Sequence, residues 1–310
     1  MDNLTEAQLL ELFEGKSNFD DLVDYYILQY PQCIDSKLFF EENESNYITI
    51  QGIYYYFGII VKKNISKAIE LYQKAIDLNN SNAMNSLAYY YIDNNSTEQD
   101  AIELYQRAIN LDNTMAMNNL AFYYINNNIE QNINYAIELF ERAVELNNSI
   151  AMNNLGTYYA NGNNVKQNIS KAVELFKKAT ELNNSFAMTN LAICYKNRYG
   201  VDQDIDYAIE LYERAINLNN SGAMYHLALH YESSEQDIDD AIKLYERAIN
   251  LNNSNAMNKL ALCYKNGTNV KQDDLKAIEL FERAIELDNT TAMTNLAYYY
   301  KNGVNVKQDI

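Results

Sequence analysis

Apolar positions recur at helical spacing in the stretch 149–184. Ala151, Leu155 and Tyr159 stand four residues apart, and most of the residues between them are polar or small. Residues spaced in this way fall on one face of an α-helix, so the pattern predicts an amphipathic helix with one buried side. Gly162 follows the pattern, and glycine favours the left-handed backbone conformation with which many helices end.

A second helix is predicted in the same stretch. Ala172 and Ala179 stand seven residues apart, with Leu175 and Phe176 between them, which again describes one face of a helix. Asn168 lies four residues before the first of these alanines, and asparagine is a common residue at helix N-termini. The stretch therefore predicts two helices joined by a short loop.

This helix pair is repeated along most of the chain. An Ala-Met dipeptide near the start of each first helix recurs every 33 to 36 residues, and the differences in length fall in the loop between the two helices. A repeat of this period predicts a solenoid, in which each unit packs only on its neighbours. The predicted solenoid covers residues 46–310 as seven units and a half unit at 290–310, and the alanines of the dipeptide are Ala83, Ala116, Ala151, Ala187, Ala223, Ala256 and Ala292.

Each helix has a predicted N-cap. Ser or Thr stands two residues before the recurring alanine of every first helix, and its hydroxyl is expected to accept a backbone N–H of the first turn. These residues are Ser81, Thr114, Ser149, Ser185, Ser221, Ser254 and Thr290. The predicted N-caps of the second helices are Asn64, Thr97, Asn132, Asn168, Asp204, Asp237 and Asp273. Glu-to-Lys or Glu-to-Arg pairs four residues apart, such as Glu70–Lys74 and Glu138–Arg142, indicate that the second helices have a solvated outer face.

The repeated motif resembles the Sel-one-like repeat, a close relative of the tetratricopeptide repeat. The matching positions in one unit are Ala151, Leu155, Gly156, Tyr159, Gly162, Ala172 and Ala179. Most other units have alanine at the position of Gly156, which does not change the expected fold. The resemblance implies an all-α fold, a right-handed α/α superhelix (solenoid) of antiparallel helix pairs whose first helices line the concave face. It also implies an adaptor that binds a protein or peptide partner on that face.

Residues 1–45 do not fit the repeat. Leu4–Glu14 and Phe19–Tyr30 are two candidate amphipathic helices. A solenoid needs atypical terminal units with a polar outer face, so this segment is interpreted as a helical cap. An independent recognition module is the alternative.

The chain is acidic, with a net charge of −18. Nucleic acids and anionic membranes bind basic surfaces, so we expect neither as a partner. The acidity fits a basic protein partner or simply keeps the chain soluble. No apolar run reaches the length of a transmembrane helix, and residues 1–6 lack the features of a signal peptide. The cysteines Cys33, Cys194 and Cys263 form no close pair, which predicts a reduced, cytosolic protein.

Two histidines are the only candidates for metal chemistry. His226 and His230 stand four residues apart on one predicted helix, a spacing that can hold zinc. The residues between them include no catalytic glutamate. Cys194 and Cys263 share the position of His230 in the flanking units, but ligands from three units would lie too far apart. We therefore interpret both histidines as ordinary half-buried side chains, and we expect no metal, no cofactor and no enzymatic activity.

Polar residues near the middle of the first helices are the candidate partner-binding site. Side-chain amides in a row could hydrogen-bond the backbone of an extended peptide, because each amide is both donor and acceptor. The alternative is compositional bias, since asparagine is frequent throughout the chain. Tyrosine clusters at 54–56, 89–91 and 298–300 are expected to belong mainly to the core. The candidate concave-face residues are Asn85, Asn118, Asn119, Asn153, Asn154, Asn190, Tyr225, Asn258 and Asn295, with Ser86, His226 and Lys259 completing the row.

The half unit at 290–310 includes a first helix but no second one. Leu296 and Tyr300 are expected to lose the face on which they would pack, and Asp309 occupies the cap position of the missing helix. The sequence thus predicts a frayed or partner-covered end, and self-association through the C-terminal half unit. Three functions follow: an adaptor, a structural protein that assembles through its solenoid ends, and, as the weakest hypothesis, an enzyme or metal protein built on His226 and His230.

Overall fold

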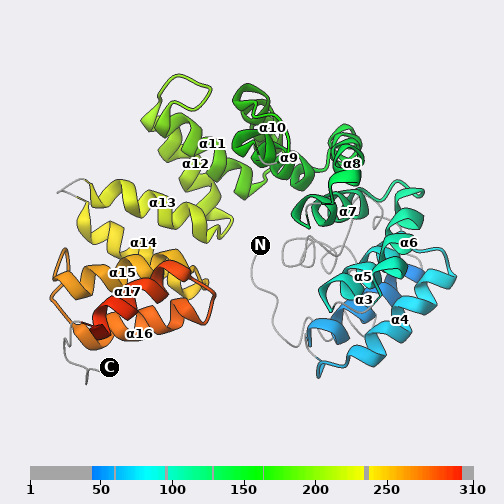
Figure 1. Ribbon diagram of the computed structural model, residues 1–310, viewed down its shortest axis with the longest axis horizontal. Coiled ribbons are helices and arrows are strands. Elements are labelled where there is room, and N and C mark those ends of the chain that lie inside the picture. The colour runs from blue at the N-terminus through cyan, green and yellow to red at the C-terminus, as the bar shows by residue number, and fades with distance from the viewer. Residues whose placement is uncertain are drawn as a thin grey trace. The chain divides into compact units, whose positions relative to one another are not determined.

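The computed structural model describes residues 44–58, 61–94, 97–127, 129–162, 164–233 and 237–301 (Figure 1). Within these ranges the chain forms α-helices, a single 3₁₀ turn and no strand. The predicted amino-terminal cap lies outside the described residues, apart from its last two residues. The predicted second-helix cap Asp309 also lies outside them.

The helices alternate as the repeated pattern predicts, which confirms an all-α solenoid of antiparallel helix pairs. The first helices are α3 (Glu44–Phe57), α5 (Ser81–Asp93), α7 (Thr114–Asn126), α9 (Ser149–Asn161), α11 (Ser185–Asn197), α13 (Ser221–Glu232), α15 (Ser254–Asn266) and α17 (Thr290–Lys301). The second helices are α4 (Ile65–Asp77), α6 (Glu98–Ile109), α8 (Ile133–Glu145), α10 (Ile169–Glu181), α12 (Ile205–Asn217), α14 (Ile238–Asn250) and α16 (Asp274–Ile285), and a 3₁₀ turn η2 (Glu130–Asn132) precedes α8.

The helices form two compact units that divide within α9. The amino-terminal unit comprises Met1–Leu155 and Gly162–Lys166, and the carboxyl-terminal unit comprises Gly156–Asn161 and Gln167–Ile310. In both units a first helix packs on its own second helix, which in turn packs on the first helix of the next repeat. Successive first helices also contact each other, as α3 does with α5, α5 with α7, and α11 with α13. The first helices of a unit therefore form one continuous layer.

The core of each repeat consists of small and aromatic side chains at fixed positions. The alanines that start and end the packed face of the second helix, such as Ala68 and Ala75, are fully buried. An aromatic residue of the second helix, such as Tyr72 or Phe140, fills the space between the paired helices. At Gly156 an added Cβ would lie 2.7 Å from the ring of Phe176, so glycine allows that ring to approach the helix backbone.

The predicted N-caps of the first helices are wrong by one residue. The capping residue is the asparagine that precedes each Ser or Thr, and its Oδ1 accepts the backbone N–H of the recurring alanine. This bond is 2.9 Å from Ala83 to Asn80 and 2.8 Å from Ala151 to Asn148. The caps are Asn80, Asn113, Asn148, Asn184, Asn220, Asn253 and Asn289.

The hydroxyls that were expected to cap instead join neighbouring repeats. The Nδ2 of Asn113 donates to the hydroxyl of Ser81 in the preceding first helix at 3.1 Å. The Nδ2 of Asn148 donates in the same way to Thr114 at 2.8 Å. One asparagine thus satisfies a helix end with its oxygen and the preceding repeat with its nitrogen.

The cap asparagine also closes the second helix before it. The backbone N–H of Asn113 donates to the carbonyl of Ala108 at 3.1 Å, and Asp112 between them adopts a left-handed conformation with φ of 56°. Asparagine and aspartate tolerate this conformation better than other residues with side chains. The same Leu-Asn/Asp-Asn sequence ends every second helix, so each junction between repeats has one local structure.

The second helices begin after the predicted residues, but the side chains of Thr97, Asn132 and Asp237 make no capping hydrogen bond. Asn64, Asn168, Asp204 and Asp273 accept a backbone N–H with their side chains. The predicted surface pairs Glu70–Lys74 and Glu174–Lys178 form at 2.7 Å. Arg142 departs from the prediction, because it pairs with Asp112 of the preceding repeat rather than with Glu138.

Candidate functional site

The predicted asparagine row is a chain of hydrogen bonds in the amino-terminal unit. Asn154 donates to Asn118 at 2.9 Å and Asn119 donates to Asn85 at 3.0 Å, so these bonds join successive first helices. Asn118 donates to Asn119 at 3.1 Å within α7, and Asn153 donates to Asn154 at 3.5 Å within α9. The structure therefore brings these five residues together, although it pairs them with one another.

The row has a buried side and an exposed side. Asn85 is fully buried and Asn118 is 5% exposed, whereas Asn119, Asn153 and Asn154 are partly exposed. The amide of Asn154 gives one N–H to Asn118 and accepts one from Asn153. An amide has two N–H groups and two lone pairs, so Asn154 can make further bonds at the surface.

The row changes character in the carboxyl-terminal unit. Asn190, Tyr225 and Asn258 are partly exposed, and Asn295 donates to Asn258 at 2.8 Å. His226 stands in the row between them and stacks on Tyr212 with the ring centroids 6.1 Å apart. The row thus consists of hydrogen-bonded asparagine side chains in the amino-terminal unit, whereas asparagine alternates with other side chains in the carboxyl-terminal unit.

Both histidines have lowered pKa values. Burial lowers the pKa of His226 and that of His230, and the Lys196 cation lowers both further. Burial also raises the pKa of the Cys194 and Cys263 thiols to about 11. Over the stretches that the structure describes, no three His, Cys, Asp or Glu side chains gather closely enough to hold a metal ion.

A cluster of donor side chains around the Glu232 carboxylate lies beside the row, and it was not predicted from the sequence. Glu232 at the end of α13 pairs with Lys259 of α15 at 2.9 Å, and the hydroxyl of Tyr245 in α14 donates to it at 3.0 Å. The thiol of Cys263 lies 3.8 Å from its other oxygen. The Glu232 side chain is only 16% exposed, so these three donors compensate for the loss of water.

The sequence does contain a signal for this cluster. Glu232 occupies the position at which the neighbouring first helices have Lys196, Lys265 and Lys301. The helices α3, α5 and α7 have no lysine or arginine. The first helices are therefore amide-rich and without basic residues in the amino-terminal unit, whereas those of the carboxyl-terminal unit have several lysines and the half-buried Glu232.

The tyrosine clusters divide between core and surface, so they belong to the core less completely than predicted. Tyr54 and Tyr299 are fully buried or nearly so, whereas Tyr298 is 60% exposed. Leu296 remains 8% exposed in α17, so the predicted loss of packing at this residue is not observed. Met293 on the same helix is 52% exposed, although the equivalent methionines, such as Met257, are at most 3% exposed.

None of the helices in the described ranges has the length and apolar composition needed to cross a membrane. Their repeated pairs, joined by identical junctions, define an α-solenoid repeat protein. A model of the Sel1 repeat family matches consecutive segments that extend from residue 52 to the end of the sequence. The chain belongs to this family, and the matched segments are 52–80, 81–113, 114–148, 149–184, 185–220, 221–253, 254–289 and 290–310.

Solved structures share the fold at low sequence identity. The Escherichia coli protective antigen c5321, which displays an SLR fold, is 20% identical, with a TM-score of 0.55 over 97% of this chain and 68% of that one. A Sel1 repeat protein from Oxalobacter formigenes is 22% identical, with a TM-score of 0.51 over 86% of this chain and 99% of that one. Yeast Tom70 is 21% identical, with a TM-score of 0.55 over 94% of this chain and 58% of that one. A search of curated proteins found no match.

Proposed function

We propose that this chain is a noncatalytic scaffold that binds a partner protein or peptide on the layer formed by its first helices. The observation that carries the proposal is the row of amides along α5, α7 and α9, which is partly exposed and held in one orientation by hydrogen bonds between helices. Membership of the Sel1 repeat family supports it, because the repeats of this family generally serve as scaffolds.

The two units offer different chemistry to a partner. An extended peptide presents alternating N–H and C=O groups, and amides such as Asn154 and Asn295 can bond to either. In the carboxyl-terminal unit, the Lys196 cation favours acidic groups of the partner. Exposed Phe122 (47% exposed), one turn from Asn118 and Asn119 on α7, adds an apolar anchor of the kind found at interfaces.

Site-specific crosslinking tests this surface. A photoreactive phenylalanine replaces Phe122 on first helix α7, and the matched control replaces Tyr135 (38% exposed) on second helix α8. We expect a partner to crosslink from position 122 and not from position 135. The affinity of the purified partner should then fall about tenfold in N154A/N295A, a loss of ~1.4 kcal/mol. Equal crosslinking from both positions, or unchanged affinity, would contradict the proposal.

Self-association through α17 is a second candidate function. It is favoured by Met293, which is 52% exposed although the equivalent methionines are at most 3% exposed. Light scattering on the wild type and on M293E tests this function. We expect the wild type to form oligomers that M293E dissociates, whereas a monomeric wild type would exclude this function.

A further inference from the structure

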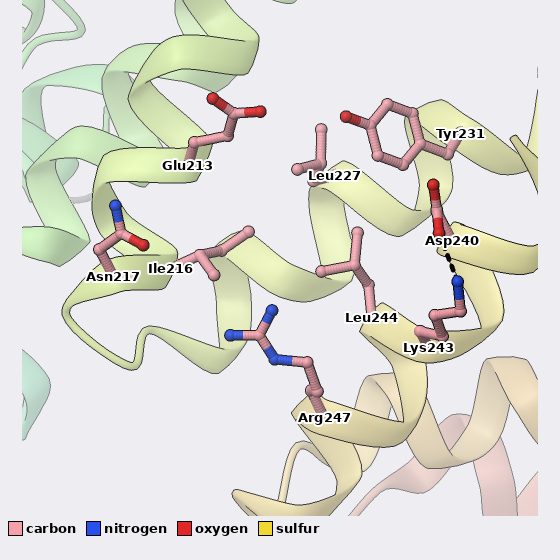
Figure 2. Close-up of a pocket in the computed structure, with 9 residues that line it drawn as sticks. All are labelled: Glu213, Ile216, Asn217, Leu227, Tyr231, Asp240, Lys243, Leu244 and Arg247. Atoms are coloured by element: carbon pink, nitrogen blue, oxygen red, sulfur yellow. Dashed lines mark hydrogen bonds and ion pairs between the residues drawn. The ribbon is translucent and has the colours of Figure 1, made fainter.

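Two equivalent grooves lie between successive second helices of the carboxyl-terminal unit, on the side of the repeats opposite the first-helix layer. Groove 1, of about 450 Å³, lies between α12 and α14, and Figure 2 shows its lining. Its floor is Ile216, Leu227 and Leu244, and Arg247 lies at one end. Groove 2, of about 350 Å³, lies one repeat further along between α14 and α16, with Arg283 at the position of Arg247.

Both grooves have an arginine at one fixed position, Arg247 or Arg283, and a glutamate at another, Glu213 or Glu246. On the rim of groove 1, Asp240 and Lys243 form an ion pair of 2.8 Å. Groove 2 has Lys276 at the position of Asp240 and Glu279 at the position of Lys243. Figure 2 shows the guanidinium of Arg247 beside Ile216 and away from this ion pair. Within the part of the chain that the structure describes, neither Arg247 nor Arg283 makes an ion pair or a side-chain hydrogen bond.

The amino-terminal unit shows what an arginine at this position binds. Arg142 occupies the same position in α8, and its Nη2 donates to the Asp112 carboxylate at 2.5 Å. The same nitrogen lies 3.3 Å from the carbonyl oxygen of Ile109, the residue equivalent to Ile216. A carboxylate is therefore the ligand of this arginine where the chain supplies one.

Neither groove has a carboxylate at the position of Asp112. Asn219 and Asn252 stand where Asp112 stands, and all three adopt the left-handed conformation, with φ of 57°, 57° and 56°. The backbone of the junction is thus the same, and only the charge differs. A neutral amide cannot replace the carboxylate as the charged partner of a guanidinium.

We propose that grooves 1 and 2 bind an acidic segment of a partner protein in which glutamate or aspartate alternates with apolar residues. The partner carboxylate takes the place of the Asp112 carboxylate at Arg247 or Arg283, and a neighbouring apolar side chain covers the floor. Leu244 and Ile216 are only 8% and 6% exposed, so the carboxylate–guanidinium contact selects the segment and the floor adds a smaller contribution.

The net charge of the chain does not prevent this binding. The charge of −18 repels an acidic segment at long range, but salt screens such repulsion beyond ~8 Å at physiological ionic strength. The contact at the guanidinium is shorter than that distance. This surface is separate from the first-helix layer, so its occupation is independent of the scaffold function proposed above.

The test uses the difference between the repeats. The double variant N219D/N252D introduces at both grooves the carboxylate that Asp112 provides to Arg142, at positions whose backbone accepts aspartate. The probe is a short fluorescein-labelled peptide in which glutamate alternates with leucine, and glutamine replaces glutamate in its control. The control variant N197D/N266D adds the same charge at exposed ends of the first helices α11 and α15.

We expect the wild type and N197D/N266D to bind the glutamate peptide by fluorescence anisotropy and to bind the glutamine peptide at least about tenfold more weakly. N219D/N252D should bind the glutamate peptide about tenfold more weakly than N197D/N266D does, and R247A/R283A should show a similar loss. Equal affinity of the two double aspartate variants would overturn the proposal, and so would a wild type that does not distinguish the two peptides.

Discussion

Replacing Asn113 by alanine should remove two stabilising contributions at once. The Oδ1 of Asn113 caps α7 by accepting the N–H of Ala116 at 2.9 Å, and loss of such a cap costs about 1 kcal/mol. Its Nδ2 donates to Ser81 and Asn82 across the junction at 3.1 and 3.0 Å. These side chains are at most 8% exposed, and loss of a donor to buried acceptors costs ~1–3 kcal/mol. The free energy of unfolding should therefore fall by ~2–4 kcal/mol in N113A.

Two further variants separate the cap from the junction. N113D keeps an oxygen that can cap α7 but replaces the donor with a carboxylate facing Asn82, so it should lose ~1–3 kcal/mol although the cap remains. N253A removes a similar cap, but its Nδ2 makes only one bond, 3.3 Å to Ser221, at a partly exposed site. That variant should lose only about 1 kcal/mol.

Urea unfolding followed by circular dichroism measures these differences, and hydrogen exchange of the Ala116 amide reports the cap itself. N113A should be the least stable of the three variants, and the Ala116 amide should stay protected in N113D. The reasoning would be refuted if N113D were as stable as the wild type, or if N113A and N253A lost the same stability.

Two other predictions concern the carboxyl-terminal unit. Burial, and then the Lys196 cation, lowers the pKa of His226, so the unfolded chain binds more protons and stability should fall as the pH drops below about 6.5. The melting temperature of the wild type should decrease more between neutral and acidic pH than that of H226Q, and an equal decrease would contradict this. K259M leaves Glu232 without its cation, so the free energy of unfolding in urea should fall by ~1–2 kcal/mol. The control K265M should lose less stability, and equal losses would show that the Glu232 ion pair adds no stability.

The spacing of apolar residues was sufficient to predict the helix pairs, because each repeat is short and its helices pack on near neighbours. It did not assign the first-helix caps correctly. Asn113 and Thr114 are both common capping residues, and local sequence does not choose between them. The choice depends on the preceding repeat, where Ser81 accepts the second bond of Asn113.

The candidate site was predicted less completely than the fold. The regular spacing placed Asn118 and Asn154 on adjacent first helices, but it did not show that their amides bond to each other. The Glu232 cluster needs side chains from α13, α14 and α15, which come together only through packing. A repeat-by-repeat comparison of charge at a fixed position would have singled out Glu232.

The junction between repeats has a consequence for how such a chain changes in length. Its Leu-Asn/Asp-Asn sequence is constant, and the variation from 33 to 36 residues falls in the loop inside each repeat. The capping and junction hydrogen bonds of Asn113 and Asn148 reach only the preceding repeat or the helix that each residue caps. Duplication or deletion of a whole unit would therefore rejoin ends that keep the same capping bonds, although pairs between particular repeats, such as Lys259 with Glu232, would be lost with a deleted unit.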